Sequence, residues 1–463
     1  MNVTTVDEGA GLKRYDVFVI GGGGTGSEVA FSIARESNMN VGIAERDKFG
    51  GECNHYGCVP TKVMLRSAKI AALARDAGRF GVRIPEVGID FKAIMTRARE
   101  IIDSQSGDGP KPFYDAGIDV ILDEVRLIGP HSLEVADGTK IEADRIVLTT
   151  GSEPTAPPIP GLEGTPYWTN KEAIWKPRDV PASLAVLGTG AIGTEFAQIY
   201  ARFGSNVTMI ENAPHILPLE DAESGASMLP ALEAEGIRVM AGAQTKGVTF
   251  DGEGWHLEIE GQGAIVAEEL LIATGRKPCF DEHDLEAAGV KTDAEDKPVL
   301  NESLRTTGED VWVAGDATGD LLFTHVGTYE AELVVADILG HPRKADYRVV
   351  PRVTFSDPEV ASVGLTEKQA RKDGREVKTA VLKFEDNERA TIEGKTFGIV
   401  KLIADEETGD LLGGHIVGEE AGAMIHIVVA AMAGRLDTRV AGEAIYAYPT
   451  FAESVKGAFL QLG

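Results

Sequence analysis

The sequence predicts an α/β protein with two similar βαβ units and a C-terminal α+β domain. Two observations predict this fold class. First, an apolar run, a glycine-rich turn, a helical segment, a second apolar run and an acidic residue occur in this order twice, over residues 15–45 and 184–211. Second, the C-terminal region alternates apolar runs with turns, and residues 421–434 have helix-like apolar spacing. A chain of 463 residues is expected to form about two to four domains, so each unit can have its own core.

The first βαβ unit leads from the apolar run VFVI into the turn GGGGTG and then into a helix-forming segment. Gly21 permits the tight turn, Gly23 lets a pyrophosphate approach the backbone, and Gly26 lets the helix pack closely against the strand. Glu45 ends the second strand about 20 residues further on, where a carboxylate accepts hydrogen bonds from a ribose. Strand, glycine spacing and acid together predict a Rossmann-like dinucleotide site rather than a structural glycine turn.

The second unit repeats this pattern with Gly188, Gly190 and Gly193 after the run LAVL, and Glu211 ends its second strand. A carboxylate at that position repels a ribose 2′-phosphate, and residues 212–216 contain no arginine that would bind one. The second site is therefore expected to take NADH in preference to NADPH.

The proline-rich segment 154–160 cannot continue a helix or a central strand, which predicts a domain crossing near residue 150. A later apolar run, VWVAGD, places Asp316 at the tip of a buried strand and indicates that the chain returns there to the first domain. The expected domains are residues 1–150 and 277–346 for the first dinucleotide domain, 151–276 for the second, and 347–463 for the C-terminal domain.

The net charge is −28, and such an acidic surface repels nucleic-acid phosphates and anionic lipid. The sequence contains no uncharged apolar run of roughly 18 residues that could cross a bilayer. Residues 1–14 lack both the basic start and the apolar stretch of an export signal, and they are expected to form a short tail. Neither nucleic acid nor a membrane is expected as a partner, and the expected location is cytoplasmic.

Only three cysteines occur, which are too few for a secreted disulfide framework or a four-thiolate site, so no metal is expected. Cys53 and Cys58 follow the first dinucleotide motif at a spacing that can close a small redox-active ring. A lysine or a positive helix end nearby would lower the pKa of a thiol toward the reactive thiolate. Composition alone also allows two buried structural thiols or half of a metal site. Cys279 has no partner in sequence and is expected to be a small packed hydrophobe.

Several motifs together resemble a known family. They are the two glycine turns, the segment GGECNHYGCVPTK, the turns TGS and ATGR, and the segments VWVAGDAT and VPRVTFSDPEVASVG. Over almost the whole chain they resemble the pyridine nucleotide-disulfide oxidoreductases, which include dihydrolipoamide dehydrogenase, glutathione reductase and mercuric reductase. The letters CVPTK are most similar to the dihydrolipoamide dehydrogenase branch. The resemblance implies two Rossmann-like domains, for FAD and then for NAD, a C-terminal α+β dimerisation domain and a homodimer.

The resemblance also implies roles for individual residues. Cys58 would lie against the flavin as the charge-transfer thiol, and Cys53 would exchange with a substrate disulfide. Lys62 and Glu195 would pair near the reactive edge of the flavin, although the residues alone allow two solvated charges. Asp316 would hold the ribityl chain, although its pattern alone allows an ordinary acid at a strand end. The other implied cofactor residues are Thr150, Gly151 and Ser152 for FAD, with Gly275 and Arg276 for NAD.

The chain departs from this family near its C-terminus. Disulfide-reducing members carry a histidine where this chain has Tyr448, whereas Glu453 keeps the position of the family's glutamate, and both would face Cys53 of the partner subunit. A tyrosine, with a pKa of about 10, is normally a donor and seldom a base, which disfavours dithiol–disulfide exchange. His55 is a candidate for the missing base, and the alternative is a surface histidine with no catalytic part. Mercuric reductase also has a tyrosine there but ends in a vicinal cysteine pair, whereas this sequence ends FLQLG, so mercury reduction by that relay is not expected.

The expected function is that of an FAD-dependent NADH:disulfide oxidoreductase similar to dihydrolipoamide dehydrogenase. NADH would reduce FAD, FAD would reduce the Cys53–Cys58 disulfide, and Cys53 would attack a small-molecule or lipoyl-type disulfide. One alternative is a diaphorase-like enzyme that reduces quinones, oxygen or metal ions, which Tyr448 favours. The other is a nucleotide-binding subunit with little turnover, which would need neither both cysteines nor Lys62.

Overall fold

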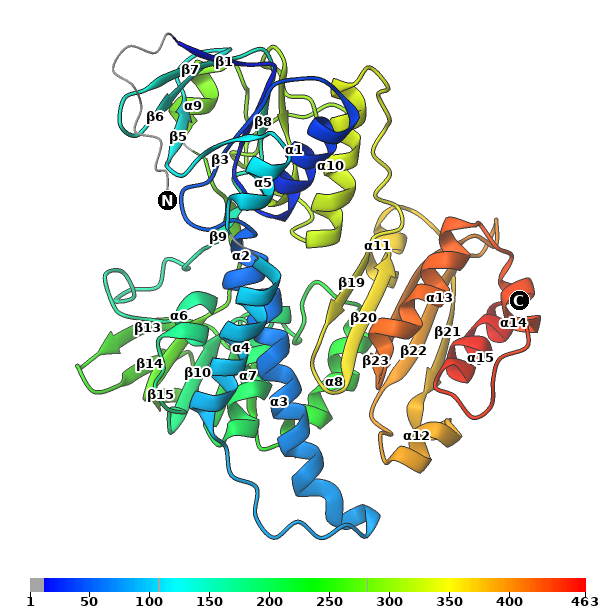
Figure 1. The fold of residues 1–463 in the computed structure, drawn as a ribbon. Helices are drawn as coiled ribbons and strands as arrows, with labels where there is room; N and C mark the ends of the chain where they lie inside the picture. Colours follow the sequence, from blue (N-terminus) through cyan, green and yellow to red (C-terminus); the bar gives the residue numbers. More distant parts are fainter. Residues whose placement is uncertain (1–11, 107–108, 281) are drawn as a thin grey trace. The chain divides into compact units, whose positions relative to one another are not determined.

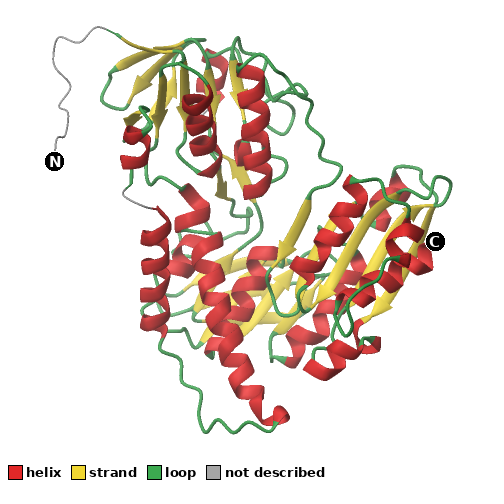
Figure 2. Ribbon diagram, turned by 45° about the vertical axis from the view of Figure 1, so that its right-hand side comes forward, coloured by secondary structure: helices red, strands yellow, loops and turns green. Residues whose placement is uncertain are grey.

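The chain forms two compact units in a computed structural model, which describes residues 12–106, 109–280 and 282–463. Residues 1–11 of the expected N-terminal tail lie outside the described part. The first unit comprises the residues up to 60, 99–153 and 276–346, and the second comprises 61–98, 154–275 and 347–463. Within each unit, helices lie against the faces of sheets (Figures 1 and 2).

The first unit is built on a five-stranded parallel sheet with the strand order β18-β8-β2-β3-β4. The central strands are apolar throughout, as expected for strands that are buried on both faces. In the register of β2 and β3, Val17 lies opposite Val41. The bounds are β2 Val17–Ile20, β3 Val41–Ala44, β4 Asp119–Ile121, β8 Ile146–Leu148 and β18 Val311–Val313.

Helices cover one face of this sheet and a smaller sheet covers the other. Helices α1 (Gly24–Glu36) and α10 (Thr324–Ile338) contact each other, and Val334 of α10 lies in one core with Val17 of β2. On the opposite face, the sheet β1-β7-β6-β5 buries Leu133 in a second core with Phe18. The other elements of this unit are β1 Lys13–Tyr15, α2 Gly51–His55, α5 Lys111–Asp115, β5 Val125–Leu127, β6 Ser132–Val135, β7 Lys140–Ala143, β9 Ser152–Pro154, β17 Arg276–Pro278, α9 Glu282–Ala287 and the 3₁₀ turn η2 Gly315–Thr318. Helices α3 (Cys58–Asp76) and α4 (Phe91–Ser106) contribute residues to both units.

The second unit contains a four-stranded parallel sheet with the order β12-β11-β10-β16. An antiparallel sheet, β13-β14-β15, packs on it through a core that includes Trp255 and Leu270. The bounds are α6 Asn170–Trp175, β10 Ser183–Leu187, α7 Ala191–Phe203, β11 Asn206–Glu211, α8 Ala222–Ala234, β12 Arg238–Ala241, β13 Thr245–Phe250, β14 Trp255–Ile259, β15 Gly263–Ala267 and β16 Glu269–Ile272, with the 3₁₀ turn η1 Ala77–Phe80.

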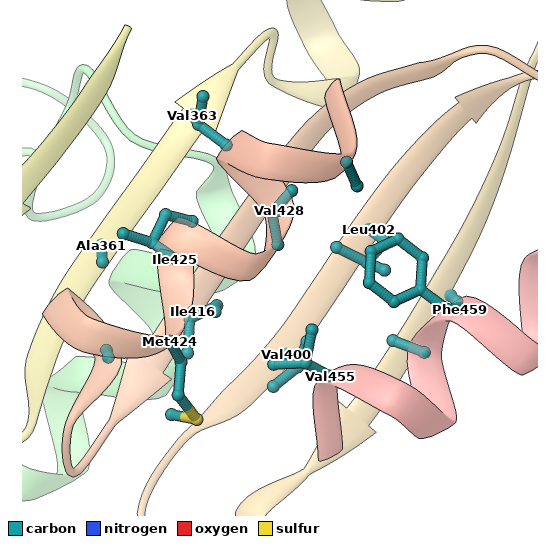
Figure 3. Close-up of a cluster of buried hydrophobic side chains, with 14 of the residues drawn as sticks. Ala361, Val363, Val400, Leu402, Ile416, Met424, Ile425, Val428, Val455 and Phe459 are labelled. Atoms are coloured by element: carbon teal, nitrogen blue, oxygen red, sulfur yellow. The ribbon is translucent and has the colours of Figure 1, made fainter. Parts of the chain in front are cut away.

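The C-terminal part of the second unit is a five-stranded antiparallel sheet, β19-β20-β23-β22-β21, with helices on one face. Figure 3 shows Val428 of α13 and Phe459 of α15 above the sheet residues Val400 and Ile416, with which they form one core. The bounds are β19 Pro351–Thr354, β20 Glu359–Gly364, α11 Glu367–Lys372, β21 Val377–Lys383, η3 Phe384–Asp386, α12 Glu388–Glu393, β22 Ile399–Asp405, β23 Leu411–Gly418, α13 Ala421–Ala433, α14 Thr438–Glu443 and α15 Ala452–Leu462.

The structure confirms the predicted fold class and the elements on which it rests. The two βαβ units are β2-α1-β3 and β10-α7-β11, and the helix expected over residues 421–434 is α13. Within the described ranges, no helix is both long and apolar enough to cross a membrane. The expected domain limits remain predictions.

Candidate active site

The glycine turn after β2 has the geometry that its sequence predicts. Gly21 has a φ of +107°, and a Cβ there would lie 2.3 Å from the carbonyl oxygen of Thr149. A Cβ on Gly26 would lie 1.9 Å from the carbonyl oxygen of Gly21, so only glycine lets α1 pack this closely. At Gly23, by contrast, no described atom lies within 4 Å of the place that a Cβ would occupy, so the backbone there is open to a ligand.

The N-terminus of α1 is free to hold an anion. Gly23 is its N-cap and has no side chain that could satisfy the first backbone N–H groups, and its first turn contains no acidic residue. Glu45 lies beside this turn, where its carboxylate accepts hydrogen bonds from the backbone N–H groups of Gly22 at 2.8 Å and Asp47 at 2.7 Å. These contacts fix the carboxylate at the edge of the open turn.

A cavity of about 370 Å³ adjoins this turn within the first unit. Gly21, Glu45, Thr150 and Cys279 contribute to its lining. The hydroxyl oxygen of Thr150 is buried and has no hydrogen-bond partner among the described residues, which indicates that a ligand completes this wall. The open glycine turn, the helix N-terminus and this polar cavity fit a dinucleotide such as FAD. Cys279, expected to be a packed hydrophobe, lies half-buried in this wall, and its backbone N–H donates to the carbonyl of Gly151.

Asp316 follows β18 and is bound by two other predicted residues. The hydroxyl of Ser152 donates to its carboxylate at 2.6 Å, and Arg276 Nε donates to the same Ser152 hydroxyl at 2.9 Å. Burial raises the pKa of Asp316, while the Ser152 hydrogen bond and the Arg276 charge act in the opposite direction. Arg276 Nη2 also donates to the carbonyl of Ser152 at 2.7 Å. Arg276, which the resemblance links to NAD, thus binds Ser152 of the first unit through two of its nitrogens.

Cys53 and Cys58 lie next to each other in the first unit, and both are thiols in this structure. Cys53 lies on the short helix α2 and is half-buried, whereas Cys58 is the first residue of α3 and is exposed. The hydrogen bond that the Cys53 thiol donates to Cys58, followed by burial, raises the pKa of Cys53 well above its usual range. The Cys53 thiol therefore holds its proton more firmly than an isolated thiol does.

Thr324 is a residue of this site that the sequence does not reveal. Its Oγ1 lies 3.8 Å from the sulfur of Cys58, and it is the first residue of α10. The partial positive charge at a helix N-terminus favours a thiolate, so α10 supplies the positive helix end that the cysteine pair was expected to need. The only sequence signal is that a helix-forming segment follows the VWVAGDAT strand and turn.

The glycine turn of the second unit repeats the geometry of the first. Gly188 has a φ of +94°, and a Cβ on Gly193 would lie 2.0 Å from the carbonyl oxygen of Gly188. No described atom lies near the Cβ position of Gly190, which is also the N-cap of α7. Glu211 accepts hydrogen bonds from Thr189, at 3.0 Å from its N–H and 2.8 Å from its hydroxyl. The turn is thus open in the same way, with a fixed carboxylate beside it.

Lys62 and Glu195 form an ion pair within the second unit. Lys62 Nζ lies 2.8 and 3.0 Å from the two carboxylate oxygens of Glu195, which is buried. Phe355 supports the pair twice, because its N–H donates to Glu195 at 2.9 Å and its ring lies 4.7 Å from Lys62 Nζ. The sequence pairs Lys62 with Glu195 only through the resemblance and contains no sign of Phe355.

The remaining candidates occupy separate places. His55 is half-buried on α2, and its Nε2 lies 2.9 Å from the carbonyl oxygen of Phe49, so that nitrogen acts as a donor. Tyr448 is 69% exposed, and its hydroxyl donates to Glu388, which raises the pKa of the phenol. Glu453 accepts the N–H of Thr450 at 3.1 Å at the start of α15. Gly275, with a φ of +151°, forms the turn between β16 and β17.

Comparison with known proteins decides the family. The profile described as pyridine nucleotide-disulphide oxidoreductase matches residues 15–332, and the profile of its dimerisation domain matches residues 350–459. The chain belongs to this family. Members of the pyridine nucleotide-disulphide oxidoreductases are flavin-dependent enzymes, and this chain is accordingly an FAD-dependent, pyridine nucleotide-dependent disulfide oxidoreductase. Its dimerisation domain supports a homodimer.

Relatives with two different printed activities are similar to the chain over nearly its whole length. A mercuric reductase of Bacillus cereus is 36% identical, with 99% of this chain and 73% of that protein covered. A dihydrolipoyl dehydrogenase of Bacillus subtilis is 33% identical, with 96% of this chain and 98% of that protein covered. Among solved structures, the HOCl-induced flavoprotein disulfide reductase RclA from Escherichia coli has a TM-score of 0.86 at 29% identity, covering 96% of this chain and 99% of that chain.

Proposed function

We propose that the protein uses NADH to reduce the Cys53–Cys58 disulfide and that the resulting dithiol reduces a small-molecule or lipoyl-type disulfide. The observation that carries this proposal is the adjacency of the two sulfurs at the N-terminus of α10, where Thr324 Oγ1 lies 3.8 Å from Cys58. Bound FAD would supply two-electron transfer between the pyridine nucleotide and the cysteine pair. The residues proposed to hold it are Gly21, Gly23, Gly26, Glu45, Thr150, Gly151, Ser152 and Asp316.

The chemistry of the cysteine pair follows from its geometry. The sulfur of Cys53 would attack the acceptor disulfide while its thiol proton passes to the departing sulfur, which releases one thiol and leaves a mixed disulfide on Cys53. Cys58, stabilised as a thiolate by α10, would then attack the Cys53 sulfur, which releases the second thiol and closes the Cys53–Cys58 disulfide. Two electrons from NADH reopen that disulfide, so one NADH and one proton are consumed for each acceptor disulfide that becomes two thiols.

The proposed pyridine nucleotide is NADH, bound at Gly188, Gly190 and Gly193 and beside Glu211. The carboxylate of Glu211 is held next to the open turn and would repel a 2′-phosphate.

Lys62 and Glu195 are proposed to act at the flavin's reactive edge. The proposed domain limits are 1–150 and 277–346 for FAD, 151–276 for NAD with its boundary at Gly275 and Arg276, and 347–463 for dimerisation.

Tyr448 favours a second candidate function, namely the reduction of quinones, oxygen or metal ions. The hydrogen bond to Glu388 raises the pKa of Tyr448, so the phenol is already protonated at neutral pH. It therefore cannot take a proton from a thiol during disulfide exchange, as a histidine at this position would. One-electron and metal acceptors need no such base. RclA, to which the chain is similar, is also described as a Cu(II) complex, which makes copper a reasonable metal to test.

The test is steady-state NADH oxidation by the purified protein with lipoamide, glutathione disulfide, a quinone and Cu(II) as parallel acceptors, over roughly pH 6 to 10. Disulfide turnover that is lost in Cys53→Ser and Cys58→Ser supports the first function. The second function would replace the first if the protein reduces a quinone or Cu(II) but no disulfide, and if Cys53→Ser keeps that activity. Equal turnover of NADPH and NADH would overturn the proposed nucleotide preference.

A further inference from the structure

The helix that carries Cys53 has little apolar anchoring of its own. All five residues of α2 are partly exposed, and the helix begins after two glycines with positive φ, Gly50 at +90° and Gly51 at +58°. A short helix without buried side chains is held in place by the contacts of its polar groups. The side chain next to Cys53 in sequence is that of Glu52, and its partner therefore bears on where Cys53 lies.

Glu52 pairs with Arg276, which reaches it from β17. Arg276 Nη2 lies 3.3 Å from Glu52 Oε1, and the two side chains are 13% and 28% exposed, so water screens the pair only in part. The same guanidinium donates to Ser152, whose hydroxyl in turn donates to Asp316 at 2.6 Å. One arginine thus connects α2, the TGS turn and the acid after β18 through directional bonds, all within the first unit.

We propose that Arg276 is a positioning residue that fixes the cysteine-bearing helix α2, through Glu52, relative to Asp316. The inference rests on the proposed function, in which Asp316 holds FAD and Cys53 exchanges with the acceptor. It adds a role to Arg276, which the sequence links only to the pyridine nucleotide, and it gives Glu52 a role.

The test uses the FAD-loaded dimer and two readouts that do not depend on turnover. They are the hydrogen exchange of the backbone amides of residues 51–57 and the rate at which iodoacetamide alkylates Cys53 in the dithiothreitol-reduced protein. In Glu52→Gln and in Arg276→Gln, exchange at residues 51–57 is expected to be about five- to tenfold faster, and Cys53 alkylation to change in both variants alike. The double variant is expected to match the single variants, because both remove one interaction.

Arg305→Gln is the matched control, since Arg305 Nε also lies 3.3 Å from a carboxylate, that of Asp337, in the same unit. It is expected to leave residues 51–57 and Cys53 at wild-type rates. Unchanged exchange in Glu52→Gln, additive effects in the double variant, or equal effects in Arg305→Gln would overturn the proposal. Flavin bleaching by NADH in the wild type is measured in parallel; its absence would reject the proposed function, while the exchange rates still decide the role of Arg276.

Discussion

At the scale of single residues, Asp357 shows burial and ion pairing in opposition. Its side chain is only 7% exposed, and Lys395 and Arg202 lie 2.8 and 2.9 Å from its carboxylate. Burial raises the pKa of Asp357, but the two cations outweigh it and lower the pKa to about 2. Since the pKa of an unfolded aspartate is about 3.9, the ionised carboxylate stabilises the fold above that pH, and this stabilisation is lost as the pH falls from about 4 to 2.

Asp357→Asn is therefore expected to lower the free energy of unfolding at pH 7 by about 2 kcal/mol, because two cations lose their charged partner. Denaturant unfolding at several pH values measures this, and the difference from wild type should shrink below about pH 4. Asp251→Asn is the control. The pKa of Asp251 is also lowered to about 2, chiefly by a hydrogen bond from the backbone of Glu253. Its side chain, however, is 50% exposed, whereas that of Asp357 is buried. An Asp357→Asn protein with the same free energy of unfolding as the wild type at pH 7 would contradict this explanation.

Tyr448 presents a second prediction at this scale. The hydrogen bond to Glu388 raises the pKa of its phenol, so Tyr448 holds its proton more firmly than an ordinary tyrosine and does not serve as a base at neutral pH. Tyr448→His is expected to raise disulfide turnover about tenfold or more and to give it a titration near pH 6.5, because imidazole can cycle its proton. Tyr446→His, two residues earlier, is the control and should bring no gain. Equal rates in Tyr448→His and wild type would show that proton transfer is not limiting.

At the scale of elements, the turn between β2 and α1 contains one glycine that close packing requires, Gly26, and one whose backbone is open to a ligand, Gly23. A methyl group on Gly26 would meet the carbonyl of Gly21 at 1.9 Å, whereas one on Gly23 would enter open space. Gly23→Ala is therefore expected to keep the melting temperature of the FAD-free protein and to weaken FAD binding about tenfold or more, because the methyl occupies the path of the pyrophosphate.

Titration of the FAD-free protein with FAD, followed by flavin fluorescence, measures this prediction. Gly24→Ala is the matched control, since its Cβ also meets no described atom but its position in the turn is not one of the three fingerprint glycines. It should bind FAD like the wild type. Weak binding by Gly24→Ala, or an unfolded Gly23→Ala protein, would mean that the turn is constrained for structural reasons instead.

The sequence predicts these elements well because their signals are local. The runs VFVI and VGIA became β2 and β3, and the apolar spacing over residues 421–434 became α13. What local signals cannot supply is the partner of an element. Thr324 meets Cys58 across 266 residues, and Phe355 meets Glu195 across 160, since both contacts depend on how strands and helices are ordered in the fold.

At the scale of the whole molecule, the dimerisation domain makes subunit mixing informative. We propose that Tyr448 and Glu453 complete the cysteine site of the partner subunit, so a defect in one subunit can be compensated by the other. Mixing inactive Cys58→Ser and Glu453→Gln homodimers is expected to restore about one quarter of wild-type activity, because half of the dimers become mixed and each of those has one intact site.

Activity and dimer composition are measured on the same refolded mixtures, by NADH oxidation and native mass spectrometry. A mixture of Cys58→Ser with Cys53→Ser is the control, since every site then lacks one sulfur and no activity should return. Mixed dimers of the first pair without activity would place Glu453 in the site of its own subunit.

The two dinucleotide units, the cysteine pair and the C-terminal domain could all be predicted from the amino-acid sequence. This was possible because glycine conformation, strand and helix periodicity and short spacings are properties of neighbouring residues. The folded chain was needed to show which groups meet: α10 with Cys58, Phe355 with the Lys62–Glu195 pair, and Arg276 with Glu52. Such contacts join residues far apart in the chain, and their geometry follows from sheet order and packing, which no single stretch of sequence encodes.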